Sequence, residues 1–406
     1  MAGVFKDDKC FIASVMTMHQ LQILVVCPCP IRGKTIGLIE DFLVQFDGLI
    51  ASGVQVHLFD THFYQDHNPK NYKVSRYYGV PKRIKERVIR KIPVLRAWYA
   101  KKCVLLKFHE IISLEHYDLV VLYQMPSYSD HIVRIAHGFG SKVALFPWGS
   151  EVLRANKGIE EHLKIAFSET DFVVGYEGSN LLKKARDYYR VDENRVKDFP
   201  LKNKGFQWLQ DLEGKKTREE MISILGIPNS PYIIICGYNG YKTQRHTVMI
   251  NAIASIKGSL PKDYILVFPM TYAAPLDYVE ELKSLCEKEQ LHSFFLTQYM
   301  SDEQIAYLHL ITDLFINIQP TDNGNAFMLE ALFCNNQILT GSWLNYNQFE
   351  KFGIPYHTID SLNDLPQKLN DIFTGKAEKV RVPQELIDKY RNNMRFDMKS
   401  FWQNLL

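Results

Sequence analysis

The sequence predicts an α/β protein built from two Rossmann-like domains, each containing a parallel sheet. Short β-branched and apolar runs alternate with longer amphipathic stretches along most of the chain. A polar, aperiodic stretch near residues 201–228 interrupts this alternation once, and the pattern then restarts. Because the chain has 406 residues, 46% of them hydrophobic, it is long enough to form two ordinary cores.

Five strands are expected in each half of the chain. Those of the first half are 22–28, 54–60, 119–125, 142–148 and 172–176, and those of the second are 232–238, 264–270, 293–298, 314–320 and 337–341. Residues 37–53 have helical apolar spacing and end on Gly53, which suits a helix C-terminus. We therefore expect domains at 1–200 and 229–378, a linker at 201–228, and a C-terminal helix at 379–406 that packs back on the first domain.

Composition excludes several classes of protein. The net charge of +3 favours neither a nucleic-acid-binding protein nor a strongly anionic one. The seven cysteines include no C-x-x-C pair, which indicates reduced thiols rather than a disulfide framework. The sequence has no apolar run of the ~18 residues that a membrane span needs, and no signal-peptide pattern at its start. We therefore expect a cytoplasmic protein.

One stretch, "QPTDNGNAFMLEALF", places polar residues between an apolar strand-like run and an apolar helix-like run. In doubly wound folds, ligands bind at such strand-to-helix turns, and the first amides of the helix suit a phosphate. Glu330 lies inside the helical run, where a carboxylate needs hydrogen-bond donors such as ribose or sugar hydroxyls. The alternative is an ordinary helix N-cap, at Asp322 or Asn323, followed by a surface glutamate.

Two other nucleotide motifs are excluded. "PCPIRGKTIG" ends like a phosphate-binding P-loop, but Pro28 stands where that loop needs its first glycine. No G-x-G-x-x-G follows a strand, so a nicotinamide or flavin cofactor is not expected. The sequence also lacks D-x-D, a common metal-binding motif of enzymes that use nucleotide substrates, and we expect no metal and no other cofactor.

Residues 307–341 resemble the nucleotide-sugar site of GT-B glycosyltransferases, especially glycosyltransferase family 4, in which two acidic residues eight positions apart bracket a glycine-rich turn. Asp322 and Glu330 have that spacing. The resemblance implies that Glu330 binds the ribose and that the turn meets the diphosphate or the sugar. This chain departs from the family in having Asp322 in place of Glu and an Asn-rich turn. The donor-binding residues implied here are Asp322, Asn323, Gly324, Asn325, Ala326 and Glu330.

Other blocks extend this resemblance. "YIIICGYNGYKTQRH" is similar to the first strand and basic loop of the family's donor domain, which implies that Gly237, Gly240, Lys242 and Arg245 contact the donor phosphates. For the two cations, the alternative is a solvated loop. "VALFPWGSEVLR" and "ILVFPMTYAAPLDYVEELKS" resemble the bacterial Fuc4NAc (4-acetamido-4,6-dideoxygalactose) transferase.

The turn Trp148-Gly149-Ser150-Glu151 is expected to face the donor site from the acceptor domain. An acceptor hydroxyl must lose a proton as it attacks, and a nearby carboxylate can serve as the base. Glu151 is the first candidate for this role. It is equally explained as a first-turn glutamate favoured by the helix dipole. The pair Asp130 and His131, which follows another strand, is the second candidate, with a structural role as its alternative.

Residues 70–107 carry thirteen Lys and Arg against one acidic residue, Glu86. Apolar residues recur there at helical spacing, so the segment is either a helix that rests on an anionic membrane or a solvated helix face.

Together these features predict a glycosyltransferase of the GT-B fold, with two domains facing one another across a cleft. It would move a sugar from a nucleotide-diphospho-sugar to a glycan acceptor, lipid-linked in bacterial surface polysaccharide synthesis, and act at the inner face of the cytoplasmic membrane. The alternatives are a nucleotide-sugar 2-epimerase of the same fold, a non-catalytic GT-B partner subunit, and a transferase whose acceptor is a protein side chain.

Overall fold

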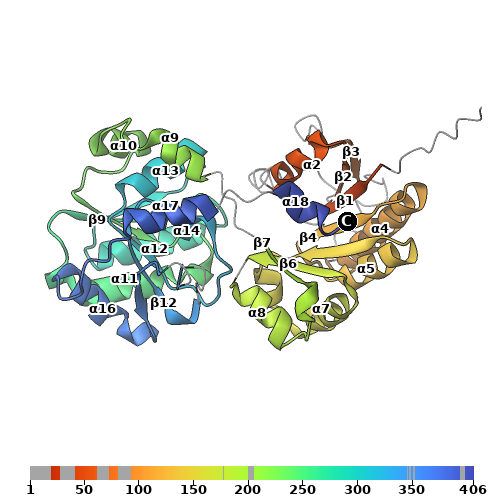
Figure 1. Cartoon of the computed structure of the whole chain (residues 1–406). Coiled ribbons are helices and arrows are strands. Elements are labelled where there is room, and N and C mark those ends of the chain that lie inside the picture. The colour runs from red at the N-terminus through yellow and green to blue at the C-terminus, as the bar shows by residue number, and fades with distance from the viewer. Residues whose placement is uncertain are drawn as a thin grey trace, which may run out of the picture.

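The computed structural model contains two parallel sheets, each covered by helices on both faces (Figure 1). It describes residues 20–27, 42–61, 73–80, 93–176, 178–199, 205–344, 346, 349–350, 353–393 and 398–406. Every strand pair is parallel, which confirms the predicted α/β class.

The first sheet has seven strands in the order β3-β2-β1-β4-β5-β6-β7. They are β1 (Gln22–Cys27), β2 (Gln55–Asp60), β3 (Arg76–Gly79), β4 (Leu119–Tyr123), β5 (Lys142–Phe146), β6 (Phe172–Tyr176) and β7 (Val196–Phe199). The helices of this domain are η1 (Val44–Phe46), α2 (Asp47–Ala51), α4 (Pro93–Leu114), α5 (Ser129–Gly138), α6 (Ser150–Leu153), α7 (Lys157–Glu169), α8 (Asn180–Asp187) and η3 (Glu193–Arg195).

Alternate residues of the first sheet enter two different cores, as the period of a strand requires. Leu24 and Val26 join a core with α4, α5, α7 and α8, whereas Ile23 and Val25 join a core with η1 and α2 on the other face. All four side chains are fully buried. Burial on both faces explains why the strands are apolar throughout rather than alternating.

The second sheet has six strands in the order β10-β9-β8-β11-β12-β13. They are β8 (Tyr232–Cys236), β9 (Tyr264–Pro269), β10 (Ser293–Leu296), β11 (Leu314–Asn317), β12 (Gln337–Gly341) and β13 (His357–Ile359). The helices are α9 (Gly205–Leu212), α10 (Arg218–Leu225), η4 (Lys242–Gln244), α11 (His246–Ser255), η5 (Lys257–Ser259), α12 (Leu276–Lys288), α13 (Asp302–Ile311), α14 (Ala326–Phe333), η6 (Ser342–Leu344), η7 (Leu362–Asp364), α16 (Leu365–Phe373) and α17 (Gln384–Asn393). The last helix of the chain, α18 (Met398–Gln403), packs on the first domain.

Residues predicted as a linker fold largely as the helices α9 and α10. Both contact α13, and α9 also contacts α14. Met221, Ile222 and Leu225 of α10 are buried in the same core as the second sheet. These helices therefore belong structurally to the second domain. The exact boundaries of the domains stay predictions.

The C-terminal stretch returns to the first domain through α18 alone. In Figure 1, α17 lies with the second domain and α18 lies beside α2 of the first. Trp402 of α18 is fully buried and stacks on Phe46, with their ring centroids 4.7 Å apart. Ile387 of α17, in contrast, is buried in the core of the second domain. The predicted return of the chain is thus carried by a short aromatic helix.

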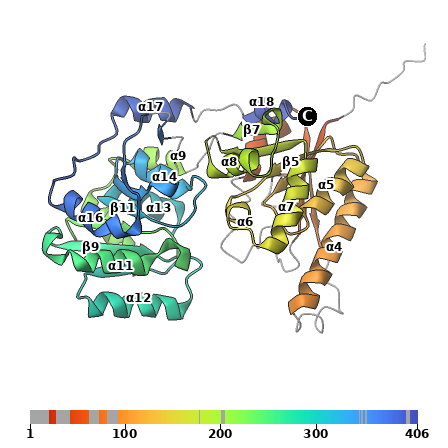
Figure 2. The ribbon, with the colours of Figure 1, turned by 90° about the horizontal axis from the view of Figure 1, so that it is seen from below.

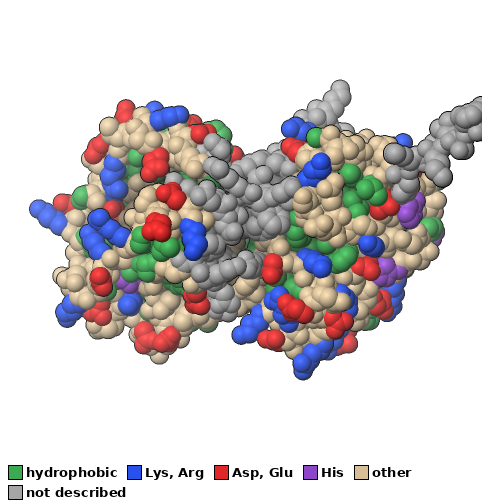
Figure 3. Space-filling model, viewed as in Figure 1, with side chains coloured by type: hydrophobic (Ala, Val, Ile, Leu, Met, Phe, Trp, Pro, Cys, Tyr) green, Lys and Arg blue, Asp and Glu red, His purple; other side chains and the backbone are tan. Residues whose placement is uncertain are grey.

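The surface mixes charges of both signs. On the face shown in Figure 3, Lys and Arg side chains are interspersed with Asp and Glu on both domains. None of the described helices combines the length and the apolar character needed to cross a bilayer. The predicted basic segment 70–107 falls partly outside the described residues. Its described helix, α4, extends beyond the rest of its domain in Figure 2.

Candidate functional site

The order of strands places two loops of the second domain side by side. β8 lies between β9 and β11, so the strand order reverses at β8: β9 and β10 follow on one side of it, and β11 to β13 on the other. In open parallel sheets, ligands bind at the carboxyl ends of the strands where this reversal occurs. The loop after β8 contains Gly237 to Arg245, and the turn after β11 contains Asp322 to Asn325. Nearly all the predicted donor-binding residues therefore lie at this edge.

Asp322 is the centre of a buried hydrogen-bond network. Its Oδ1 accepts a bond of 2.8 Å from the backbone amide of Asn323, and its Oδ2 accepts bonds from the side chains of Asn317, Asn325 and Tyr346. Burial raises the pKa of Asp322 above its ordinary value, although these hydrogen bonds oppose the rise. The carboxylate thus serves mainly to hold the turn in shape.

Asn325 continues this network into α14. Its Oδ1 accepts a 2.7 Å bond from the amide of Met328, so that Asn325 is the N-cap of the helix, which begins at Ala326. Gly324 precedes it with φ of 72°, a conformation that favours glycine. The turn is consequently fixed at both ends, and the first turn of α14 is directed at the edge of the sheet.

Glu330 lies under this turn rather than on the helix surface. It is 6% exposed, and its Oε2 is 2.8 Å from Nε2 of His309 on α13. Gly205, the first residue of α9, lies so close that a Cβ there would collide with the Glu330 carboxylate. The carboxylate expected to bind ribose therefore has a histidine partner and a glycine that makes room for it.

The loop after β8 needs glycine at two positions because its neighbours approach closely. A Cβ on Gly237, whose φ is 70°, would lie 2.9 Å from Nε2 of His246. A Cβ on Gly240 would collide with Ala274, since the Gly240 amide is bonded to the carbonyl of Tyr272. Both glycines therefore shape the loop.

The two predicted cations of this loop are placed differently. Arg245 donates a 3.1 Å bond to the carbonyl of Ile318, beside the Asp322 turn, and burial lowers its pKa. Lys242 has a side chain 67% exposed, which lies over the ring of Tyr278 and 3.9 Å from Glu281. The structure thus brings Arg245, but not Lys242, to the turn.

Sequence reasoning missed a second buried network that joins the two loops. Gln244 donates a 3.1 Å bond to Gln319, and Gln319 donates a 3.0 Å bond to the hydroxyl of Tyr238. Asn317 and Gln319 gave a signal that could have been used, because both are polar residues at the end of a buried strand. Tyr346 and His309 were also not predicted as site residues. His309 is conspicuous only as a polar residue in an apolar helix.

The predicted acceptor-side turn contacts the second domain. Asn323 Nδ2 donates a 3.1 Å bond to the carbonyl of Trp148, and a Cβ on Gly149 would lie 2.6 Å from that of Asn323. Glu151 turns back on its own helix terminus: its Oε1 accepts a 2.6 Å bond from the amide of Trp148, and its Oε2 lies 3.4 Å from Ser150 Oγ. Burial raises the pKa of Glu151, against the effect of its hydrogen bonds.

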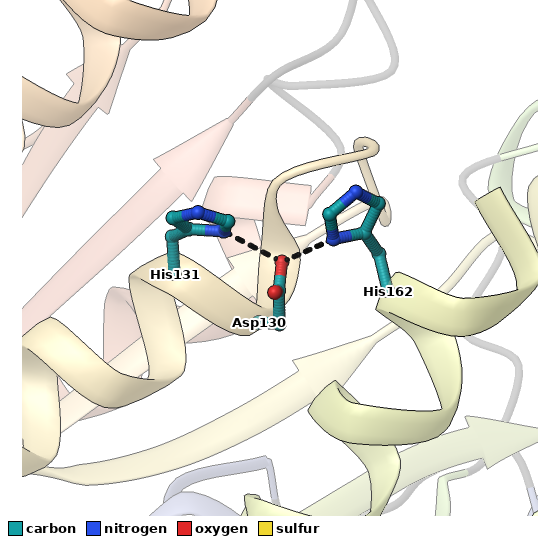
Figure 4. Close-up of side chains that lie close together, drawn as sticks. All are labelled: Asp130, His131 and His162. Atoms are coloured by element: carbon teal, nitrogen blue, oxygen red, sulfur yellow. Dashed lines mark hydrogen bonds and ion pairs between the residues drawn. The ribbon is translucent and has the colours of Figure 1, made fainter. Parts of the chain in front are cut away.

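The other predicted pair, Asp130 and His131, is joined by a third residue. Nδ1 of His131 and Nδ1 of His162 lie 2.9 and 3.0 Å from the same carboxylate oxygen of Asp130. Figure 4 shows the two rings on either side of that carboxylate, with His131 on α5 and His162 on α7. Burial would raise the pKa of Asp130, but its bonds to the histidines lower it overall. His162 could not be predicted, because it is far from Asp130 in the sequence and reaches it only when α7 packs on α5.

No protein-family model matches the sequence, and a comparison with curated proteins gave no significant match. Solved structures match in fold. A glycosyltransferase from Rickettsia africae ESF-5 has a TM-score of 0.64 at 14% identity, covering 95% of this chain and 97% of that one. Lipopolysaccharide outer core galactosyltransferase WaaB has a TM-score of 0.64 at 11% identity, covering 95% and 99%. Anabaena HepE, in complex with UDP and glucose, has a TM-score of 0.63 at 14% identity, covering 95% and 98%.

These matches extend over both domains, and this chain therefore has the GT-B fold that the resemblance implied. None of the three structures is described as a Fuc4NAc transferase, so the narrower resemblance stays a prediction.

Proposed function

We propose that this chain is a glycosyltransferase that binds a nucleotide-diphospho-sugar on its second domain and transfers the sugar to a glycan held by the first. The observation that carries the proposal is the Asp322 turn. This turn lies where the second sheet reverses, it leads into a helix N-terminus, and it contacts Trp148 of the other domain. Such a position suits a donor whose sugar must reach an acceptor on the opposite domain.

Each part of the donor has a corresponding group. The diphosphate would meet the first-turn amides of α14 and the guanidinium of Arg245, which offset its charge as it leaves without a metal in the reaction. Glu330 would accept hydrogen bonds from the ribose, with His309 holding its carboxylate in place. Complexes of Anabaena HepE with UDP and UDP-glucose support a nucleotide-sugar as the donor class.

Two carboxylates remain candidates for the base on the acceptor side. Glu151 adjoins the turn that contacts Asn323, and a pKa raised by burial makes its carboxylate a stronger base. Asp130, through His131, is the second candidate. The base accepts the proton of the acceptor hydroxyl, while the new bond forms at the anomeric carbon and the nucleoside diphosphate departs.

For the acceptor we propose a lipid-linked glycan at the inner face of the cytoplasmic membrane, as in bacterial surface polysaccharide synthesis. One face of α4 supports this part. Leu95, Trp98 and Leu106 follow one another at helical spacing and are 46, 60 and 57% exposed. Lys102 lies between them in sequence, with its ammonium 5.3 Å from the Trp98 ring centre. Exposed apolar side chains beside lysine suit an anionic bilayer surface.

A thermal-shift screen tests the proposal. The purified chain is heated with UDP, GDP, dTDP, CDP and their common sugars. A ligand at a hundred times its dissociation constant should stabilise the native state by ~2.7 kcal/mol, or a few degrees. We expect one nucleotide family to act on the wild type and on the control Lys283→Ala, but not on Glu330→Ala, and more weakly on Arg245→Ala.

The same screen separates the alternatives. If no nucleotide stabilises a well-folded wild type, the donor proposal fails and a non-catalytic partner subunit becomes the better explanation. If a donor binds, incubation with that donor alone decides the remaining case, because conversion to its 2-epimer without an acceptor identifies an epimerase.

A further inference from the structure

The cluster of Asp130, His131 and His162 has more nitrogen and oxygen donors in one place than a base would need. Their ligand atoms, Nδ1 of each histidine and a carboxylate oxygen, all lie within 4.8 Å of one another. Among the described residues, no other group of three His, Cys, Asp or Glu side chains meets that condition. Two histidines and a carboxylate are ligands typical of a first-row transition metal.

The fold holds these donors firmly while leaving them accessible. α5 and α7 pack through Ile132 and Val133 on one side and Leu163 and Phe167 on the other, all fully buried. Asp130 has a side chain 3% exposed, whereas those of His131 and His162 are 42 and 32% exposed. The carboxylate is thus anchored in the protein, and an ion can reach it from solvent.

Local charge is compatible with a cation. Arg134 lies one turn further along α5, but its guanidinium is paired with both oxygens of Glu169 at 2.7–3.1 Å. The positive charge of Arg134 is therefore largely neutralised by Glu169.

We propose that Asp130, His131 and His162 form a binding site for a divalent first-row transition metal ion, for which Zn²⁺ is the probe. Each neutral imidazole moves its proton from Nδ1 to Nε2, and the two freed lone pairs bind the ion together with the carboxylate. Ligand distances of ~2.0–2.1 Å require the two rings to close around the ion. Three protein ligands leave a coordination position open to water or to an anionic or hydroxyl group.

This site lies at the carboxyl end of β4, where the first sheet reverses between β1 and β4. It belongs to the first domain and is separate from the Asp322 turn. The metal proposal therefore does not depend on the donor site, and either can fail alone. An ion bound here would occupy Asp130 and His131 and leave Glu151 as the candidate base.

Competition titration with Zn²⁺ and a chromogenic chelator tests the site. We compare the wild type with His162→Gln and with the control His292→Gln, which changes an exposed histidine in the second domain. The wild type and the control should each take one Zn²⁺ per chain from the chelator, and His162→Gln should bind Zn²⁺ at least about tenfold more weakly. Equal affinity in all three proteins, or no competing ion in the wild type, would overturn the proposal.

Zinc X-ray absorption on the loaded wild type gives a second readout. It should show two imidazole ligands at ~2.0–2.1 Å, falling to one in His162→Gln. A sulfur-rich or single-histidine environment in the wild type would show that the ion is elsewhere and would overturn the site. Circular dichroism checks the fold of each variant, and His131→Gln provides the same comparison if His162→Gln unfolds.

Discussion

The carboxyl edges of the two sheets use polar residues in opposite ways. In the second domain, the buried Asp322 bonds to the half-buried Asn325, and both accept bonds from the backbone. In the first domain, the side chains of His131 and His162 are 42 and 32% exposed around a buried carboxylate. The difference suggests that the second edge presents a rigid backbone to a ligand, whereas the first presents reactive side chains.

Replacing Asp322 should have the largest effect on stability and on nucleotide binding. Asp322→Ala leaves the buried donors of Asn317 and Tyr346, and the half-buried amide of Asn325, without their acceptor. We expect a loss of roughly 3 kcal/mol in the free energy of unfolding, together with loss of nucleotide binding. Urea unfolding and calorimetric titration measure the two effects. The control Asp302→Ala, at the exposed start of α13, should change neither, and a stable Asp322→Ala protein would contradict the network's role.

Filling the space beside Glu330 should have the second-largest effect on stability. In Gly205→Ala the new methyl group meets the Glu330 carboxylate and must displace it from His309. Overpacking of this kind costs about 2 kcal/mol, and nucleotide affinity should fall with it. Gly258→Ala is the matched control, because nothing lies within 4 Å of a Cβ there. Unchanged affinity in Gly205→Ala would argue against a role for Glu330 in binding.

Buried and exposed histidines should also differ in their response to pH. Burial lowers the pKa of His246, which is fully buried, from 6.5 to about 4. As pH falls below 6.5 the unfolded chain takes up a proton before the folded one does, so stability present above pH 6.5 is lost toward pH 4. Between pH 7 and 5 this residue alone should cost about 2 kcal/mol.

Melting curves at the two pH values measure this dependence. His246→Gln should remove the contribution of this residue to the pH dependence of stability. The contributions of His57 and His357, whose pKa values burial also lowers to about 4, should remain. The exposed control His292→Gln should leave the dependence unchanged. An identical pH dependence in His246→Gln would show that this residue does not become protonated on unfolding.

The contact between the domains should give the smallest effect on stability. Gly149 has φ of 116° and lies against Asn323. Gly149→Ala should cost about 1 kcal/mol through backbone strain and reduce sugar transfer more than nucleotide binding, because the clash lies between the domains. Gly138→Ala, where a Cβ meets nothing within 4 Å, is the control. Equal loss of binding and transfer would place the effect within one domain.

Most of the fold was predictable from the sequence because both sheets are buried on two faces. All ten predicted strands exist, since their apolar runs are long and bounded by turns. β3, β7 and β13 were missed because "RYYG", "VKDF" and "HTI" are short and carry polar residues. The Asp322 turn was found from its polar residues between apolar runs.

The partners of the site residues were harder to predict. His162 meets Asp130, and Tyr346 meets Asp322, only after distant elements pack together. Glu330 was expected to need donors, but its histidine lies on another helix, 21 positions earlier in the chain. Spacing along a sequence locates a turn or a helix face, and it carries little information about contacts between separate elements.

The most direct test is a crystal structure of the wild type with the nucleoside diphosphate that stabilises it in the thermal screen. We predict the diphosphate at the first turn of α14, within hydrogen-bond distance of its amides and of the Arg245 guanidinium, with the ribose at Glu330. A nucleotide bound anywhere other than this edge of the second sheet would contradict it.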